Sequence, residues 1–282
     1  MPTCDLHTHS IFSDGSYTPE QLIDEAIERG LCSLALCDHN AVDGLPRFLK
    51  AAEGKPIRAI AGAEFSVNYQ GQELHLLGLF IPPSHFDAIT ARMKIVTERK
   101  EKSNLELVES LAKAGYVLDY AAAKASSPTG KINRLHIAEA LTAAGYTPSV
   151  KAAFDTVLDP GAGHYHEPER LTVWEVLDDL HAMGAVPVLA HPLLHMSEQD
   201  LSEFLPQARK RGLVGMEVYY SKYDEAQTAL ALSLAERFGI LPSGGSDFHG
   251  TGKPDISLGI GRGNLAIPEK WAEALAKKAK GI

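Results

Sequence analysis

Hydrophobic and polar positions follow one another along the chain as strands that are each followed by a helix. Residues 33–37 form a continuous apolar run, which is typical of a parallel strand buried on both faces. The helix expected before this run begins after Thr18, a favourable N-cap residue, and ends before Gly30. A first short strand is expected at residues 4–7. This order predicts a parallel strand-helix-strand crossover.

The same pattern continues to the end of the chain. Further strands are expected near residues 57–61, 73–80, 185–189, 215–219 and 240–243, and helices near 84–114, 172–183, 198–211 and 224–237. Seven strands with intervening helices indicate an α/β protein, a (β/α) barrel with one irregular position. Between residues 91 and 166 only helical patterns occur, with turn signals at 126–130 and 159–161. We therefore expect a catalytic barrel of residues 1–90 and 167–282 and a helical insertion, a substrate cap, at 91–166.

Composition and charge restrict the class of protein. With 282 residues, 45% hydrophobic and 22% charged, the chain is typical of a globular protein, which excludes disorder, collagen and coiled coil. A net charge of −9 argues against a broad basic surface for long DNA, although a small anionic substrate is allowed where positive charge is local. Three cysteines without a Cys-x-x-Cys motif, and no long apolar segment, predict a cytoplasmic protein without a membrane partner.

Residue types that bind metals gather at the ends of the expected strands. His7 and His9 alternate at the end of the first strand, so both face one way and can hold one ion. The other candidates at such positions are Asp14, His39, Glu64, His75, His191, Asp247 and His249. A single histidine or carboxylate at a strand end is more often an ordinary hydrogen-bonding residue than a metal ligand. Almost all of these residues, however, fall on the C-terminal face of the expected barrel, which is where barrel enzymes have their active sites. Nine converging residues therefore favour a metal site.

The chemistry of this set narrows the choice of metal. Imidazoles and carboxylates without a thiolate suit Mn²⁺, Fe²⁺ or Zn²⁺ better than Ca²⁺ or Mg²⁺ alone. Nine ligands exceed the needs of one ion, so three divalent ions with one bridging carboxylate are expected, with Mn²⁺ as the first choice. Bound divalent ions give the site local positive charge and lower the pKa of water to about 7, which suits phosphoester hydrolysis without a protein base.

The ordered motifs resemble those of the PHP (polymerase and histidinol phosphatase) superfamily, from residue 5 to about 260. They are Asp5-x-His7-x-His9 with Asp14-Gly15, Cys37-Asp38-His39-Asn40, Glu64, His75, Ala190-His191-Pro192 and Gly245-Ser246-Asp247-Phe248-His249. The resemblance implies a distorted (β/α)₇ barrel with a trinuclear metal centre bridged by Glu64. It assigns one ion to His7, His9, Glu64 and Asp247, a second to Glu64, His75 and His191, and a third to Asp14, His39 and His249. Glu64, Asp14 and His191 are the candidate catalytic residues.

Within the superfamily, the helical insertion and short length resemble the 3′,5′-nucleoside bisphosphate phosphatases, which remove the 3′-phosphate from adenosine 3′,5′-bisphosphate. Relatives that trim short RNA from the 5′ end share this layout, so a 5′-to-3′ exonuclease is an alternative. A non-catalytic metal-binding module is another, but it predicts lost ligands, and all nine are present. Histidinol phosphate is a further substrate to test, although nothing in the sequence favours an imidazole pocket. The proton donor to the leaving group stays open between His136, His195 and metal-bound water.

The insertion supplies candidates for a second phosphate site. In the helix expected at 84–114, the apolar stripe through Ile89 and Met93 turns basic at Arg99 and Lys100. The alternative is a surface pair whose alkyl stems cover apolar side chains. Asn133-Arg134-Leu135-His136 resembles the Arg-x-His of the phosphoesterase branch and lies at an expected helix start, which favours an anion. The candidates that bind substrate are Arg99, Lys102, Asn133, Arg134 and His136.

Overall fold

The computed structural model describes residues 2–126, 132 and 134–279. The chain forms two compact units, one of residues 1–91 and 171–282 and one of residues 92–170, which we call the barrel unit and the helical unit. Residues 167–170 thus belong with the helical unit.

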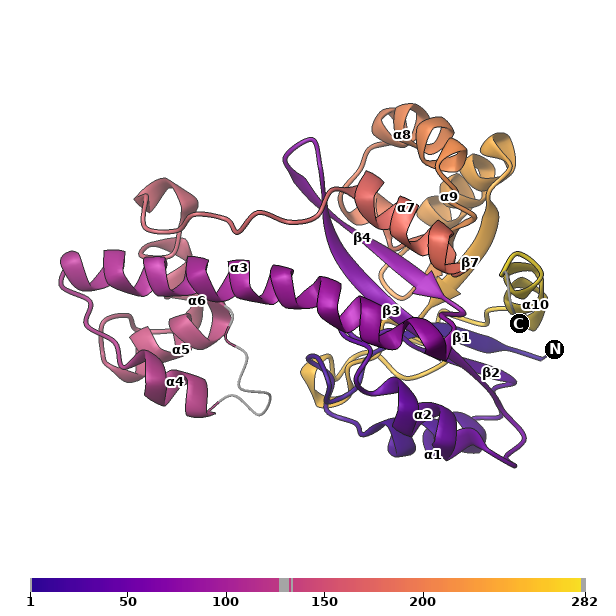
Figure 1. Ribbon diagram of the computed structural model, residues 1–282, viewed down its shortest axis with the longest axis horizontal. Helices are drawn as coiled ribbons and strands as arrows, with labels where there is room; N and C mark the ends of the chain where they lie inside the picture. Colours follow the sequence, from indigo (N-terminus) through magenta and orange to yellow (C-terminus); the bar gives the residue numbers. More distant parts are fainter. Residues whose placement is uncertain (1, 127–131, 133, 280–282) are drawn as a thin grey trace. The chain divides into compact units, whose positions relative to one another are not determined.

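The barrel unit contains one seven-stranded sheet with its strands in sequence order (Figure 1). The strands are β1 (Cys4–Thr8), β2 (Ser33–Leu36), β3 (Arg58–Tyr69), β4 (Gln72–Leu79), β5 (Val186–Leu189), β6 (Gly215–Tyr220) and β7 (Leu241–Gly245). Neighbouring strands are parallel except at β4, which is antiparallel to both β3 and β5. The loop after β7 meets β1, where the Asp247 amide donates to the His7 carbonyl over 2.8 Å. The sheet is therefore a nearly closed barrel, which confirms the distorted (β/α)₇ fold.

Six α-helices accompany the strands in the described part of the barrel unit. They are α1 (Pro19–Glu28), α2 (Leu45–Ala52), α7 (Val173–Met183), α8 (Glu198–Lys210), α9 (Glu225–Phe238) and α10 (Glu269–Ala276). At the start of α1, the Thr18 hydroxyl accepts from the Gln21 amide over 3.2 Å, and the Gln21 side chain accepts from the Thr18 amide over 2.8 Å. This reciprocal pair satisfies two amides that the helix itself leaves without partners.

The third strand is longer than expected. The sequence predicts a strand near residues 57–61 that ends at Glu64, whereas β3 runs from Arg58 to Tyr69. Gln70 and Gly71 have φ of 53° and 86°, so they form a tight turn that folds β4 back onto β3. Glu64 therefore lies within a strand and is paired across the hairpin with Leu77.

Apolar side chains from the strands fill the interior of the barrel unit. Leu6, Ala35, Leu77 and Val188 each have no exposed surface and belong to one packed cluster. Burying a side chain of the size of leucine or valine stabilises the fold by about 1.5–3 kcal/mol relative to leaving it exposed. This packing fixes the strand ends that carry the polar residues described below.

The helical unit has a core of its own. It contains most of α3 (Phe86–Lys113), which begins in the barrel unit, followed by α4 (Tyr120–Ser126), α5 (Arg134–Ala143) and α6 (Val150–Asp155). Leu107 and Leu111 of α3 pack with Ile137 and Leu141 of α5, and all four are buried.

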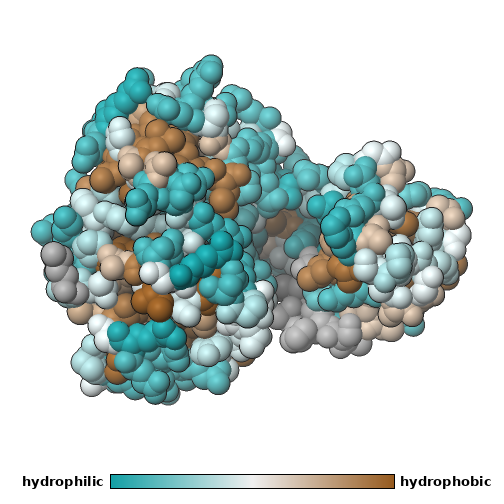
Figure 2. All heavy atoms as spheres, turned by 180° about the vertical axis from the view of Figure 1, so that it is seen from behind, coloured by the Kyte–Doolittle hydropathy of each residue, from teal (hydrophilic) through white to brown (hydrophobic). Residues whose placement is uncertain are grey.

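The surface carries few large apolar side chains, of which Val117 at 67% and Leu105 at 48% are the most exposed among the described residues. The face shown in Figure 2 is mostly hydrophilic, with separate hydrophobic patches. Within the described ranges, no helix combines the length and apolar character that crossing a bilayer requires.

Candidate metal centre

The first strand delivers two buried imidazoles to one point. His7 lies in β1 and His9 directly follows the strand, so their side chains face the same way. Both are fully buried, and their Nε2 atoms lie 3.0 Å apart. The buried Asp5 carboxylate accepts from the amides of Ser246 and Gly259 over 2.9 and 2.8 Å. Asp5 therefore ties β1 to the loop after β7, which carries further polar residues of the site.

Glu64 lies at the centre of the cluster. Its side chain is 1% exposed, and each of its oxygens faces imidazole nitrogens from several elements. The nearest to Oε1 are His75 Nδ1 at 2.8 Å and His191 Nε2 at 3.1 Å; the nearest to Oε2 are His7 Nε2 at 3.1 Å, His9 Nε2 at 3.2 Å and His39 Nδ1 at 3.1 Å. One carboxylate thus contacts five of the predicted ligands, which is the placement that a bridging ligand needs.

A second group forms the more exposed edge of the cluster. The Asp14 side chain is 53% exposed, and its carboxylate lies 3.2 Å from His249 Nε2, 3.7 Å from His39 Nε2 and 3.8 Å from His9 Nδ1. The imidazoles of His9 and His249 themselves are buried. A small molecule from solvent can therefore reach the cluster at Asp14.

The two carboxylate oxygens of Asp247 have different contact partners. Its Oδ1 lies 3.3 Å from His9 Nε2, whereas Oδ2 accepts from the Tyr220 hydroxyl over 2.8 Å and from the Lys253 ammonium over 2.7 Å. Its backbone has a φ of 58°, which is uncommon outside glycine. Lys253 is not among the residues predicted from the sequence, because a lysine in a turn-rich loop carries no signal of its own.

Burial and neighbouring charges shift the pKa values of the cluster. Burial lowers the pKa of His9, but the carboxylates of Asp247 and Glu64 outweigh it and raise this pKa to about 9. Burial also lowers the pKa of His75, but the carboxylates of Glu64 and Glu73 outweigh it and raise this pKa to about 10. For His39, burial prevails and lowers the pKa to about 3. Without metal, the buried carboxylates are therefore balanced in part by protons on imidazoles.

The residues present fit divalent ions. His39 Nδ1, Glu64 Oε2 and His191 Nδ1 are buried and make no hydrogen bond to any described residue. Leaving a buried polar atom unsatisfied costs about 1–3 kcal/mol, which a shared cation would relieve. Four overlapping groups each bring their ligand atoms within 4.8 Å of one another. They are His9, Asp14, His39 and His249; His7, His9 and Glu64; His39, Glu64 and His75; and His7, His191 and Glu217.

The last of these groups contains a residue that the sequence analysis did not assign. Glu217 lies in β6, is fully buried, and has Oε1 3.0 Å from His7 Nδ1. Its signal in the sequence was a single charged residue inside an otherwise apolar strand. Tyr220 of the same strand packs in the interior and donates its hydroxyl hydrogen to Asp247.

His195 lies at the edge of the cluster. It is exposed, and its ring centroid is 5.8 Å from that of His191 and 6.4 Å from that of His75. Partial burial and these two imidazoles lower its pKa. This direction makes His195 a poorer proton donor at neutral pH.

The predicted substrate residues of the helical unit have different surroundings. Arg99 pairs with Glu169 over 3.3 Å, and the 78% exposed Lys102 lies 3.8 Å from Glu106. The Arg134 guanidinium lies over the Tyr165 ring, 4.3 Å from its centroid. Asn133 is outside the residues that the structure describes.

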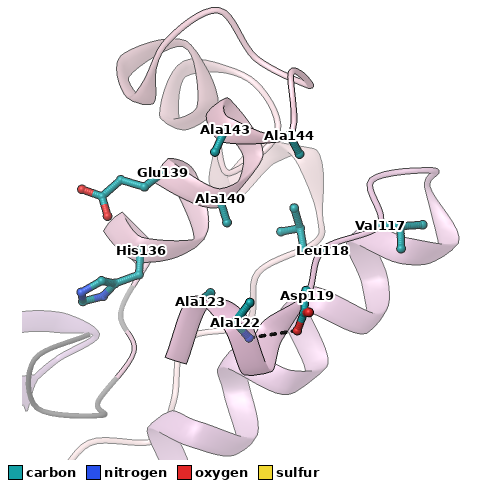
Figure 3. Close-up of a pocket in the computed structure, with 10 residues that line it drawn as sticks. All are labelled: Val117, Leu118, Asp119, Ala122, Ala123, His136, Glu139, Ala140, Ala143 and Ala144. Carbon is teal, nitrogen blue, oxygen red and sulfur yellow. Dashed lines mark hydrogen bonds between the residues drawn. The ribbon is translucent and has the colours of Figure 1, made fainter. Parts of the chain in front are cut away.

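His136 lines a pocket of about 410 Å³ within the helical unit (Figure 3). His136 and Glu139 project to one side of α5, whereas Ala140 projects toward Leu118 and α4. The lining is mainly alanine, with the carboxylates of Asp119 and Glu139 as further polar groups. Two carboxylates would repel a phosphate, so this pocket is not itself a phosphate site.

Comparison with known proteins shows the family. The model of the PHP domain matches residues 5–182. A 5′-3′ exoribonuclease of Haemophilus influenzae is 31% identical over 87% of this chain and 89% of its own length. A 3′,5′-nucleoside bisphosphate phosphatase of Chromobacterium violaceum is 29% identical over 92% of this chain and 91% of its own length.

A solved structure from Bifidobacterium adolescentis, provisionally named a metal-dependent phosphoesterase, superposes with a TM-score of 0.80 and 25% identity, covering 100% of this chain and 98% of that one. The match thus extends over both units, and most of the imidazole and carboxylate cluster lies at the strand ends where a barrel enzyme has its site. The chain therefore belongs to the PHP family, and it is a metal-dependent hydrolase of phosphoric esters.

Proposed function

We propose that the protein removes the 3′-phosphate of 3′,5′-nucleoside bisphosphates, such as adenosine 3′,5′-bisphosphate, to give AMP. The observation that carries this proposal is the metal-binding cluster around Glu64, whose residues fit divalent ions that attract a phosphate. The 3′,5′-nucleoside bisphosphate phosphatase of Chromobacterium violaceum, which is similar over 92% of this chain, supports a substrate that carries a second phosphate.

The nine predicted ligands would hold three divalent ions, with Mn²⁺ preferred, and Glu64 would be shared between two of them. When bound, the ions supply Lewis-acid polarisation of the phosphoryl group and lower the pKa of water. Glu64 and His191 are held by a buried contact with each other. The Asp14 side chain is exposed, and we expect the reactive phosphate to reach the cluster there.

Arg134 is the residue that we assign to the remote 5′-phosphate. A guanidinium over an aromatic ring keeps its positive charge and its N–H donors, and a phosphate can accept two of these donors. Arg99, Lys102, Asn133 and His136 complete the proposed substrate set. A remote phosphate held in this way orients the substrate as well as binding it.

A 5′-to-3′ exonuclease acting on short RNA is the second candidate. The observation in its favour is the exoribonuclease of Haemophilus influenzae, which is slightly more similar in sequence than the phosphatase of Chromobacterium violaceum. The metal chemistry would be shared, but the bond that breaks would be a phosphodiester. The non-catalytic alternative has less support, because the structure brings all nine predicted ligands together. Three free cysteines support the cytoplasmic location that we include in this proposal.

Product analysis separates the two enzymatic candidates. The Mn²⁺-loaded protein is given adenosine 3′,5′-bisphosphate, adenosine 3′-phosphate, histidinol phosphate and a short 5′-phosphorylated RNA, and released phosphate and nucleotides are measured. We expect the highest kcat/KM for the bisphosphate, with AMP and inorganic phosphate as products. Faster release of 5′-mononucleotides from the RNA would instead establish the exonuclease.

The variant Arg134→Ala tests the second phosphate site. A charge-assisted contact contributes about 1.5–3 kcal/mol, so kcat/KM for the bisphosphate should fall by about ten- to a hundred-fold. Adenosine 3′-phosphate, which lacks the remote phosphate, should react almost as before. Lys151→Ala is the matched control, because Lys151 is an exposed cation of the same unit that pairs with Asp155. Equal losses on both substrates would contradict the role assigned to Arg134.

A further inference from the structure

A buried carboxylate lies behind the metal-binding cluster and contacts two of its members. Glu217, in the middle of β6, is fully buried and is not among the nine predicted ligands. Its Oε1 lies 3.0 Å from His7 Nδ1, and its Oε2 accepts from the His191 backbone amide over 2.7 Å. Both oxygens of this carboxylate are therefore engaged by ligand residues.

The contact with His7 determines which of the two ring nitrogens is available. An ionised carboxylate only accepts hydrogen bonds, so His7 Nδ1 must carry the proton that it donates to Glu217. The lone pair of neutral His7 is then on Nε2, which lies 3.1 Å from Glu64 Oε2 and 3.0 Å from His9 Nε2. Glu217 thus selects the tautomer of His7 that can coordinate an ion within the cluster.

The contact with His191 acts on the backbone. His191 has a φ of 29°, a conformation that residues other than glycine rarely adopt and that needs support from its surroundings. The hydrogen bond from its amide to Glu217 supplies such support. In this conformation His191 Nε2 lies 3.1 Å from Glu64 Oε1.

We propose that Glu217 is a positioning residue that orients one ligand of each of two ions, His7 for the first and His191 for the second. Each oxygen of Glu217 already accepts a hydrogen bond from a ligand residue, which favours a role in holding these two residues over direct coordination of an ion. The proposal rests on the proposed assignment of His7 and His191 to two different ions. Neither the domain match nor the named relatives assign a role to Glu217.

Glu217→Gln is the sharpest test, because glutamine has nearly the same shape but one acceptor oxygen in place of two. One of the two positions that now accept from His7 Nδ1 and from the His191 amide would then carry an amide NH₂ group, which donates. Glu236→Gln is the matched control. It removes the same charge, but Glu236 is exposed on α9. Metal-free protein of each variant is titrated with Mn²⁺, and thermal unfolding is recorded with and without the ion.

We expect Glu217→Gln to bind Mn²⁺ about 10–100-fold more weakly, as is found when a partner of a metal-ligating histidine is removed. The rise in melting temperature on adding Mn²⁺ should shrink, while the metal-free melting temperature changes little. A purely structural role would do the opposite, lowering the metal-free value and leaving the rise intact. Wild-type Mn²⁺ affinity in Glu217→Gln would overturn the proposal.

A measurement on the wild-type protein gives a result even if the variant does not fold. In Zn²⁺-loaded protein with ¹⁵N-labelled histidine, His7 should show a protonated Nδ1 and a coordinated Nε2. Coordination through Nδ1 would overturn the proposal. If the wild-type protein bound neither Mn²⁺ nor Zn²⁺, the proposed function itself would fail, which distinguishes that result from a failure of the role of Glu217 alone.

Discussion

The strongest test of the metal centre is the substitution Glu64→Gln. Glu64 is 1% exposed, and its two oxygens contact imidazole nitrogens of five histidines at distances between 2.8 and 3.2 Å. Glutamine keeps the shape but replaces one oxygen with an amide nitrogen and removes the negative charge. In the proposed assignment, two ions would lose their shared anionic ligand.

The size of the effect follows from this sharing. Loss of a residue that only orients a ligand lowers metal affinity or activity by about 10–100-fold. A direct ligand shared by two ions should have at least the combined effect of two such losses, so we expect kcat to fall by about 1,000-fold or more. That factor corresponds to about 4 kcal/mol of transition-state stabilisation.

The assay is initial-rate phosphate release from the bisphosphate at saturating Mn²⁺, with metal content measured on the same samples. Glu73→Gln is the control, because the Glu73 carboxylate lies 3.7 Å from His75 Nε2 and its side chain is 41% exposed. A partly exposed pair at this long distance contributes about 0–1 kcal/mol, so the control should lose less than about five-fold. Retention of a tenth of wild-type turnover by Glu64→Gln, with unchanged metal content, would refute the bridging role.

Three further predictions concern the metal and the second phosphate site. Chelation should lower the melting temperature, because metal ions at a free concentration of 100 to 1,000 times their dissociation constant stabilise the fold by about 3–4 kcal/mol per site. Identical melting curves with and without chelator would argue against a preformed cluster. Since interactions with carboxylates raise the pKa of His9 to about 9 and of His75 to about 10, both carry protons at pH 7 in the metal-free protein. Mn²⁺ must displace these protons, so its affinity should rise between pH 7 and 9; calorimetry in buffers of different ionisation enthalpy should detect proton release. Tyr165→Leu should lower kcat/KM for the bisphosphate by about 2–30-fold through loss of the cation–π contact with Arg134, whereas Tyr165→Phe, which keeps the ring, should not.

The sequence predicted most of the barrel because local signals and the global fold agree there. The capping residues of α1 and the apolar run of β2 are both local, and both were predicted correctly. The end of β3 was wrong, since the turn at Gln70 and Gly71 lets the strand continue into a hairpin. Helices α2 and α10 have eight residues each and were not expected, because eight residues make little more than two helical turns and so repeat the pattern only about twice.

The metal-binding residues could be predicted because strand ends of a barrel meet on one face, which makes their convergence a consequence of topology. The residues that orient them are harder to predict. Glu217 and Lys253 belong to no motif, and their roles depend on contacts with His7 and Asp247, which are far away in the sequence. Such contacts become visible only once the register of the strands is known.

The distribution of charge in the helical unit explains why the proposed second phosphate site depends mainly on Arg134. Arg99 pairs with the Glu169 carboxylate over 3.3 Å, and Lys102 is close to Glu106, so a phosphate would have to compete with an anion already in place. Within the described part of the chain, Arg134 forms no ion pair and contacts the rings of Tyr165 and Phe154 instead. An aromatic ring attracts the cation without neutralising it. A protein with a net charge of −9 can therefore offer a local positive group to a phosphate, and among the basic residues predicted from sequence Arg134 is the one whose surroundings preserve that charge.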